Sequence, residues 1–281
     1  MKGQQNGNDY VVTLKGYSLH DSLDCGQSFR WEESSPGRFH GIAGKHVLDV
    51  CQKGDQITFE HTSEQEFQEF WCRYFDFDAD YSAFQRILCL DPILQKACEY
   101  AGGIRILRQE PWEALCSFII SQNNNIPRIK GIIARLCENF GEPLSGVDFA
   151  FPEPEAIAQC SIEELQPLRA GFRAKYILDA AKKVSSGEID LAAISKMETE
   201  EARKELMKIQ GVGPKVAECA LLFGFYRIEA FPVDVWIKRI LDRFYQQGFP
   251  EFAKPYGGIA QQYLFHYVRR HPETLEEASA R

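Results

Sequence analysis

The spacing of the apolar residues changes near Thr62, and this change limits the possible folds more than any other feature. Before it, short runs alternate between apolar and polar residues and are separated by turn signals such as SSPGR and KGD. Alternation with a period of two is typical of strands that bury one face. The region therefore predicts an antiparallel sheet of four or five strands, formed by a short strand near Val11 and by the runs at 28–31, 38–44, 46–52 and 56–61.

After Thr62 the spacing becomes helical, starting with Ser63 and Glu66, which stand three residues apart as in a capping box. Nearly every segment beyond residue 80 also predicts a helix. The expected helices begin at Asp91-Pro92 and at Pro111, and cover 125–140, 161–168, 173–186, 198–209, 214–224, 234–246 and 256–270. The predicted class is α+β, with an N-terminal antiparallel sheet and its helices at 1–105 and an all-helical region at 106–281.

The composition excludes several classes of protein. Apolar residues make up 44% of the 281 residues and aromatic residues 12%, which argues against intrinsic disorder. No apolar run is long enough to span a bilayer and the polar start lacks a signal peptide, so we expect a cytoplasmic protein with no membrane contact. The nine cysteines include no C-x-x-C pair and none follows Cys219, which predicts free thiols, no metal site and no iron–sulfur cluster.

The charge is unevenly distributed along the chain, whose formal net charge is −8. Residues 1–100 hold 9 basic and 16 acidic residues, residues 101–202 hold 11 and 15, and residues 203–281 hold 12 and 9. The overall charge argues against a general binder of polyanions. Only the last segment has a positive balance. A negative field over the rest would slow the approach of a nucleic acid, but local fields decide docking.

The sharpest local signal is the sequence GVGPK at 211–215, between two apolar helical segments. Two glycines allow a tight turn, and Pro214 suits the first turn of a new helix. Gly211, Val212 and Gly213 would then present backbone amides at a helix N-terminus, where an anion such as a DNA phosphate is favoured. We therefore predict a helix–hairpin–helix at about 202–224; the alternative is a plain corner between two helices.

Lys215 and Asp234 are the candidate catalytic residues. A lysine at the start of an apolar helix can act as a nucleophile, because desolvation and the helix dipole both favour its neutral amine. Asp234 follows Pro232 and stands where an N-cap is expected, and its carboxylate could also stabilise positive charge on a sugar if the chain folds back onto the hairpin. The alternatives are an exposed surface lysine and a cap without catalytic function.

These residues resemble a known family. LMKIQGVGPKVAEC followed by PVD is similar to the helix–hairpin–helix DNA glycosylases, and a lysine at 215 is what their bifunctional members have. The 8-oxoguanine DNA glycosylase/AP lyase branch is indicated by motifs spread over most of the chain: GQSFRW, SQNNNIPRI, GFRAKYI and AQQYLF. The resemblance implies an N-terminal sheet domain like half of the TATA-binding protein. It also implies excision of 8-oxoguanine opposite cytosine through a lysine Schiff base, followed by β-elimination.

The resemblance also implies roles for residues that would contact the damaged base. Gly26 matches the glycine whose carbonyl accepts the N7 hydrogen that distinguishes 8-oxoguanine from guanine. Cys219 and Phe265 match the pair that sandwiches the flipped base, and Gln261 matches the residue that binds its Watson–Crick edge. The alternative for Cys219 and Phe265 is simple core packing.

A second group would contact the rest of the duplex. Asn123 matches the side chain that fills the space of the flipped nucleotide, Arg128 and Arg173 match the readers of the opposite cytosine, and Phe172 matches the neighbouring wedge, where the eukaryotic pattern has tyrosine. Trp236 and Val268 replace a histidine and an aspartate that contact each other in that pattern.

The sequence therefore predicts a monomeric enzyme that acts on double-stranded DNA containing 8-oxoguanine and needs no cofactor. Two other functions stay open at this point. One is an alkylated-base glycosylase of the same superfamily, which would not need Lys215. The other is a non-catalytic module that uses the hairpin only to bind DNA phosphates.

Overall fold

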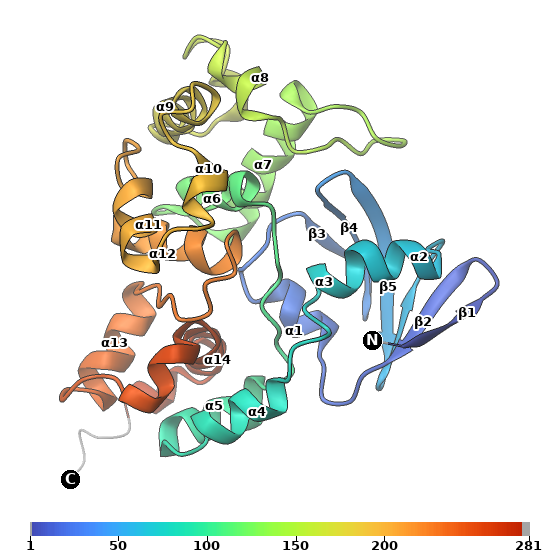
Figure 1. Cartoon of the computed structure of the whole chain (residues 1–281), viewed down its shortest axis with the longest axis vertical. Helices are drawn as coiled ribbons and strands as arrows, with labels where there is room; N and C mark the ends of the chain where they lie inside the picture. The colour runs from blue at the N-terminus through green and yellow to red at the C-terminus, as the bar shows by residue number, and fades with distance from the viewer. Residues whose placement is uncertain (1, 277–281) are drawn as a thin grey trace.

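The computed structural model describes residues 2–276 and contains an antiparallel sheet followed by a helical region (Figure 1). The sheet occupies one side of the molecule, and the helices from α6 onward occupy the other. This arrangement confirms the predicted α+β class.

The sheet has six strands in the order β1-β2-β6-β5-β4-β3, and every neighbouring pair is antiparallel. The strands are β1 (Gly3–Asn6), β2 (Asp9–Thr13), β3 (Trp31–Ser35), β4 (Arg38–Ala43), β5 (His46–Lys53) and β6 (Gln56–Phe59). The expected count of four or five was therefore too low. The additional strand is β1, whose residues are all exposed, so it lacks the alternation that marks the others.

The strand predicted at 28–31 starts only at Trp31. Phe29 instead turns into the helical core, where its ring lies 5.9 Å from that of Phe118. Residues before it form an unpredicted short helix, α1 (Leu19–Asp24), capped by the Ser18 side chain. These local differences bring Gly26 and Phe29 to the boundary between sheet and helices.

One face of the sheet is covered by the helical segment α2 (Glu64–Glu66), η1 (Phe67–Trp71) and α3 (Cys72–Tyr74). The Ser63 side chain accepts a hydrogen bond from the Glu66 amide at 3.1 Å, which confirms the predicted cap. Trp31 and Trp71 are fully buried in this aromatic core, and the Trp31 indole donates to the Tyr74 hydroxyl at 2.8 Å.

The helices that follow agree largely with the predicted ranges. They are α4 (Tyr81–Leu88), α5 (Pro92–Ala101), α6 (Pro111–Ser121), α7 (Ile126–Phe140), α8 (Pro154–Ala158), η2 (Gln166–Leu168), α9 (Arg173–Ser185), α10 (Leu191–Ile194), α11 (Thr199–Leu206), α12 (Pro214–Phe223), α13 (Val235–Phe244), η3 (Glu251–Tyr256), α14 (Gly257–Arg270) and η4 (Pro272–Leu275). The helix predicted at 161–168 was wrong. Ser161 and Glu164 do form capping bonds, but Pro167 lacks an amide and only one 3-10 turn follows.

The helical region has its own core, separate from that of the sheet. Helices α4 and α5 belong to this core although they precede most of it in the sequence, and α5 packs against α14. The Tyr263 hydroxyl on α14 lies 3.3 Å from the Ile104 carbonyl, just after α5. The last long helix therefore completes a core that begins near residue 81.

A buried carboxylate connects the sheet to the helices. Asp76 is 1% exposed and accepts hydrogen bonds from the hydroxyls of Tyr81 at 2.9 Å and Tyr226 at 2.6 Å, while Arg108 pairs with it at 2.5 Å. Burial raises the pKa of Asp76, and its hydroxyl and guanidinium partners act in the opposite direction. This network fixes the segment after the sheet to the loop after α12.

None of the nine cysteines, all in the described part of the chain, forms a disulfide, as the sequence predicted. Among residues 2–276, no helix has the length and apolar character needed to cross a membrane.

Candidate active site

The turn between α11 and α12 has the expected helix–hairpin–helix geometry. Gly211 has a φ of +79°, and a Cβ atom there would lie 2.4 Å from the Tyr176 ring, so only glycine fits. The Val212 side chain is buried and its amide donates to the Ile209 carbonyl at 3.1 Å. Gly213 then caps α12 with no side chain over the first amides, which leaves this helix end open to an anion.

Lys215 and Asp234 line one cleft of about 770 Å³. Lys215 stands in the first turn of α12, is half-buried, and has its amine 5.2 Å from the centre of the Phe118 ring. Asp234 is half-buried at the start of α13, where its carboxylate accepts a hydrogen bond from the Ile237 amide at 2.8 Å. The predicted cap is confirmed, and the capping carboxylate also faces the cleft that holds the lysine.

The loop that carries Asp234 is tied directly to the helix that carries Lys215. Glu218, one turn after the lysine, is buried and accepts a hydrogen bond from the Phe231 amide at 2.7 Å. Its other oxygen pairs with the Arg203 guanidinium on α11. Glu218 was not predicted from the sequence, because its partners Phe231 and Arg203 lie 13 and 15 residues away along the chain.

Cys219 lies behind these two residues and is 3% exposed. Burial raises the pKa of its thiol, and the neighbouring Lys215 amine acts in the opposite direction. The buried thiol therefore lies beside the Lys215 amine but is not part of the cleft lining.

Gly26 lies in the cleft wall, at the end of α1, with a φ of +81°. The next residue, Gln27, is fully buried and holds this segment in place. Its amide group donates to the carbonyls of Ser22 and Arg105 at 2.8 Å and accepts from the Leu107 amide at 2.9 Å. Gln27 is a second residue that the sequence analysis missed, although it belongs to the motif GQSFRW.

Helix α14 supplies Gln261 and Phe265. Phe265 is half-buried and lines the cleft, whereas Gln261 is 6% exposed and lies deeper. The Gln261 side-chain oxygen is buried without a hydrogen-bond partner in the part of the chain that the structure describes. A buried acceptor without a partner costs free energy, so this oxygen suits a ligand that brings its own donor.

Asn123 lies at the other rim, in the loop between α6 and α7, and is exposed with a φ of +47°. Arg173 is 2% exposed and its guanidinium donates to the Gln122 carbonyl and to the Asn123 carbonyl, the latter at 2.9 Å. Arg128 is exposed nearby, and together with burial it lowers the pKa of Arg173.

Phe172 is 48% exposed at the start of α9, with the Arg173 guanidinium 4.5 Å from the centre of its ring. Phe172, Arg173 and Arg128 are not part of the cleft lining, but the Arg173 bonds place them beside Asn123. Six predicted residues do line the cleft: Gly26, Asn123, Gly213, Lys215, Asp234 and Phe265. Trp236 and Arg269 line it as well and were not predicted to have a role.

No group of three or more potential metal-ligating side chains occurs among residues 2–276. The cleft places an amine and a carboxylate beside aromatic and amide side chains.

Comparison with known proteins gives concordant matches. Residues 10–115 match a family described as "8-oxoguanine DNA glycosylase, N-terminal domain", and residues 116–249 match one described as "HhH-GPD superfamily base excision DNA repair protein". An N-glycosylase/DNA lyase of Saccharomyces cerevisiae is 43% identical over 258 residues, which cover 81% of this chain and 68% of the yeast protein.

Two solved structures have the same fold. One is MBOgg1 in complex with a low affinity DNA ligand, with a TM-score of 0.90 and 40% identity over 96% of this chain and 99% of that one. The other is the Clostridium acetobutylicum 8-oxoguanine glycosylase/lyase bound to duplex DNA with cytosine opposite 8-oxoguanine. It has a TM-score of 0.88 and 36% identity, and the match covers 97% of this chain and 99% of that one.

Proposed function

This chain belongs to the 8-oxoguanine DNA glycosylases of the helix–hairpin–helix superfamily, and we propose that its substrate is 8-oxoguanine paired with cytosine in duplex DNA. It is a bifunctional enzyme of base excision repair, a DNA glycosylase with DNA lyase activity. One observation carries the assignment of residues: a lysine, a carboxylate, Gly26 and Phe265 meet in one cleft although they are far apart in the sequence.

Excision requires that the damaged nucleotide leave the stack, because its C1′ carbon is inaccessible inside a duplex. The exposed Asn123 side chain lines the cleft, and the exposed Phe172 ring precedes Arg173, which is bonded to the Asn123 carbonyl. They offset the cost of extrusion, a few kcal/mol, by occupying the vacated space and the adjacent step.

The flipped base enters between Phe265 and Cys219. The Gly26 carbonyl accepts the N7 hydrogen, which guanine lacks. The Gln261 oxygen, which is buried and without a partner among the described residues, accepts a hydrogen bond from the Watson–Crick edge. Guanine lacks the N7 hydrogen and would leave the hydrogen bond to the Gly26 carbonyl unmade. A buried hydrogen bond left unmade costs about 1–3 kcal/mol, so the pocket favours 8-oxoguanine over guanine.

The Lys215 amine attacks C1′ with its lone pair, the electrons of the glycosidic bond leave with the base, and the base takes up the proton that the amine loses. The Asp234 carboxylate stabilises the positive charge that develops on the sugar. Ring opening then gives a Schiff base between Lys215 and C1′. A C2′ proton then passes to solvent, its electron pair forms a C2′–C3′ double bond, and the C3′–O electrons leave with the 3′ phosphate by β-elimination.

Covalent trapping with borohydride tests this chemistry. Wild-type protein incubated with an 8-oxoguanine duplex should give a stable protein–DNA adduct, because borohydride reduces the Schiff base. Lys215→Gln should neither release the base nor form the adduct, yet should still bind the duplex. Lys96→Gln, an exposed lysine on α5, is the matched control and should trap normally.

Other outcomes distinguish the alternatives. An adduct in Lys215→Gln would exclude Lys215 as the nucleophile. Base release from alkylated DNA without trapping would indicate a monofunctional alkylated-base glycosylase. Binding without release or trapping would indicate a non-catalytic module.

We further propose that the protein acts as a monomer in the cytoplasm. The free thiols of the described cysteines suit a reducing compartment. Sedimentation of the free protein and of its DNA complex measures the stoichiometry, and two protein chains per duplex would contradict the monomer.

A further inference from the structure

Three arginines without a role so far lie next to the catalytic residues. Arg269 lines the cleft together with Lys215 and Asp234. Arg239 and Arg243 line a second hollow of about 580 Å³ between α13 and η4, which we call the α13 hollow. Trp236 lines both the cleft and the α13 hollow, so the two are neighbours on either side of its indole.

The guanidinium groups of Arg239 and Arg269 are held by aromatic rings and not by carboxylates. That of Arg239 lies 5.4 Å from the centre of a Trp236 ring, and that of Arg269 lies 5.6 Å from the centre of the Phe265 ring. Within residues 2–276 neither guanidinium has a hydrogen bond or an ion pair. A ring face orients the planar fork of an arginine while leaving its charge and its donors available.

Many other arginines of the chain already have acceptors. Arg30, Arg38, Arg108 and Arg203 pair with glutamates or aspartates. Arg243, by contrast, has a buried Nε with no hydrogen-bond partner among the described residues. Arg239, Arg243 and Arg269 thus bring guanidinium donors to one side of the catalytic cleft, in the segment that alone has a positive balance of charge.

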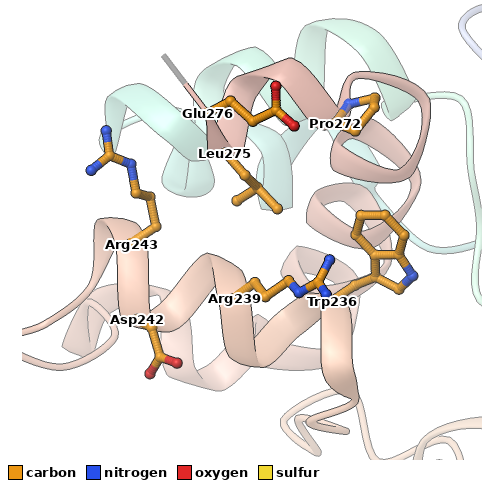
Figure 2. A pocket seen from close by; sticks show the side chains of 7 residues that line it. All are labelled: Trp236, Arg239, Asp242, Arg243, Pro272, Leu275 and Glu276. Atoms are coloured by element: carbon orange, nitrogen blue, oxygen red, sulfur yellow. The ribbon is translucent and has the colours of Figure 1, made fainter. Parts of the chain in front are cut away.

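The α13 hollow also contains carboxylates. Figure 2 shows Arg239 extending toward Trp236 and Asp242 pointing away from η4. Glu276 lies on the opposite wall, so the hollow is lined by two arginines and two carboxylates, of which Asp242 points away from η4. The two guanidinium groups can bind an anion because Asp242 points away from η4, and the facing Glu276 carboxylate weakens that binding.

We propose that these arginines form a phosphate-binding track for the damaged strand beyond the flipped nucleotide. Arg269 binds the phosphate at the mouth of the cleft, and Arg239 and Arg243 bind the following phosphates in the α13 hollow. Trp236 separates the two positions and supports the sugar between them. An arginine fork suits a phosphodiester because two parallel N–H groups reach two of its oxygens. The inference rests on the proposed function, since it requires a duplex with its lesion in the cleft.

The salt dependence of DNA binding tests the track. Affinity for an 8-oxoguanine duplex is measured over a range of salt concentrations for the wild type and for the Arg269→Gln and Arg239→Gln variants. Each variant should lose about 0.9 from the slope of log K against log salt, the value for one phosphate contact. Arg86→Gln, an exposed arginine on α4, is the matched control and should keep the wild-type slope.

Two further measurements sharpen the test. Glu276→Gln should strengthen binding, because it removes the carboxylate that opposes the arginines. Shortening the duplex on one side of the lesion, but not on the other, should abolish the difference in salt-dependence slope between Arg239→Gln and the wild type. Unchanged slopes in both arginine variants, with thermal unfolding also unchanged, would overturn the proposal.

The same samples separate this proposal from the proposed function. If borohydride fails to trap the wild-type protein on the duplex, the catalytic assignment fails. If trapping succeeds while the slopes do not change, only the phosphate track is wrong.

Discussion

Replacing Asp234 with asparagine separates two roles that the same carboxylate has in the structure. The side chain caps α13 through a 2.8 Å bond to the Ile237 amide, and it faces the cleft that contains Lys215. Asparagine is about as good a cap as aspartate, so the fold should lose only a few tenths of a kcal/mol. The charge, however, is lost completely.

The expected loss of activity is much larger than the expected loss of stability. A carboxylate about 4 Å from a developing positive charge is worth about 4 kcal/mol at an effective dielectric constant of about 20. That corresponds to base release slower by about 10²–10³-fold. Asp234→Ala should be equally slow and should also lose the cap, at a cost of about 1 kcal/mol or about 2–4 °C in melting temperature.

Single-turnover base release and thermal unfolding of both variants give the two quantities. Asp80→Asn at the start of α4 is the control, since Asp80 also caps a helix, accepting from the Ala83 amide at 3.0 Å, but lies outside the cleft lining. If Asp234→Asn releases the base at nearly the wild-type rate, Asp234 is only a cap and the electrostatic argument is refuted.

Three other changes have definite expected outcomes. Arg128→Ala should raise the activation free energy of excision by about 1–3 kcal/mol opposite cytosine and by less opposite adenine, as measured by single-turnover rates against all four bases. An equal drop in rate on every pair would show that Arg128 does not read cytosine. Gly211→Ala should cost about 1–3 kcal/mol in unfolding free energy and weaken DNA binding, whereas Gly187→Ala, with a similar φ but open space around it, should leave DNA binding intact. Glu218→Ala should lower the free energy of unfolding, measured by urea denaturation, by about 3 kcal/mol, because Arg203 and the Phe231 amide lose their acceptor. A loss below about 1 kcal/mol would show that these two bonds contribute little to stability.

The sequence was sufficient where the signal is local. The glycine-rich turn predicted the hairpin that ends at Lys215, and the position of Asp234 predicted its cap, because both depend on residues within one or two turns. Strand β1 was missed because all its side chains are exposed, and the helix at 161–168 was wrongly predicted because its capping signal is genuine but Pro167 ends it.

The residues that position the site had no such signal. Gln27 and Glu218 lie within motifs that resemble the family, but their partners Arg105 and Arg203 lie 78 and 15 residues away along the chain. Whether a buried polar side chain has an acceptor or a donor depends on which segments meet in space. Spacing along one segment therefore does not reveal it.

The packing of α5 against α14 has a consequence for synthesis on the ribosome. The sheet has its own aromatic core and can close once about the first third of the chain has emerged. Leu94, Ala97 and Ala101 on α5 belong to the other core, which is complete only when α14 is available. At a synthesis rate of about 5–20 residues per second, this apolar face stays uncovered for roughly 10–30 s in each nascent chain. The nascent chain during this interval, and not the folded enzyme, is therefore the state that most needs a chaperone.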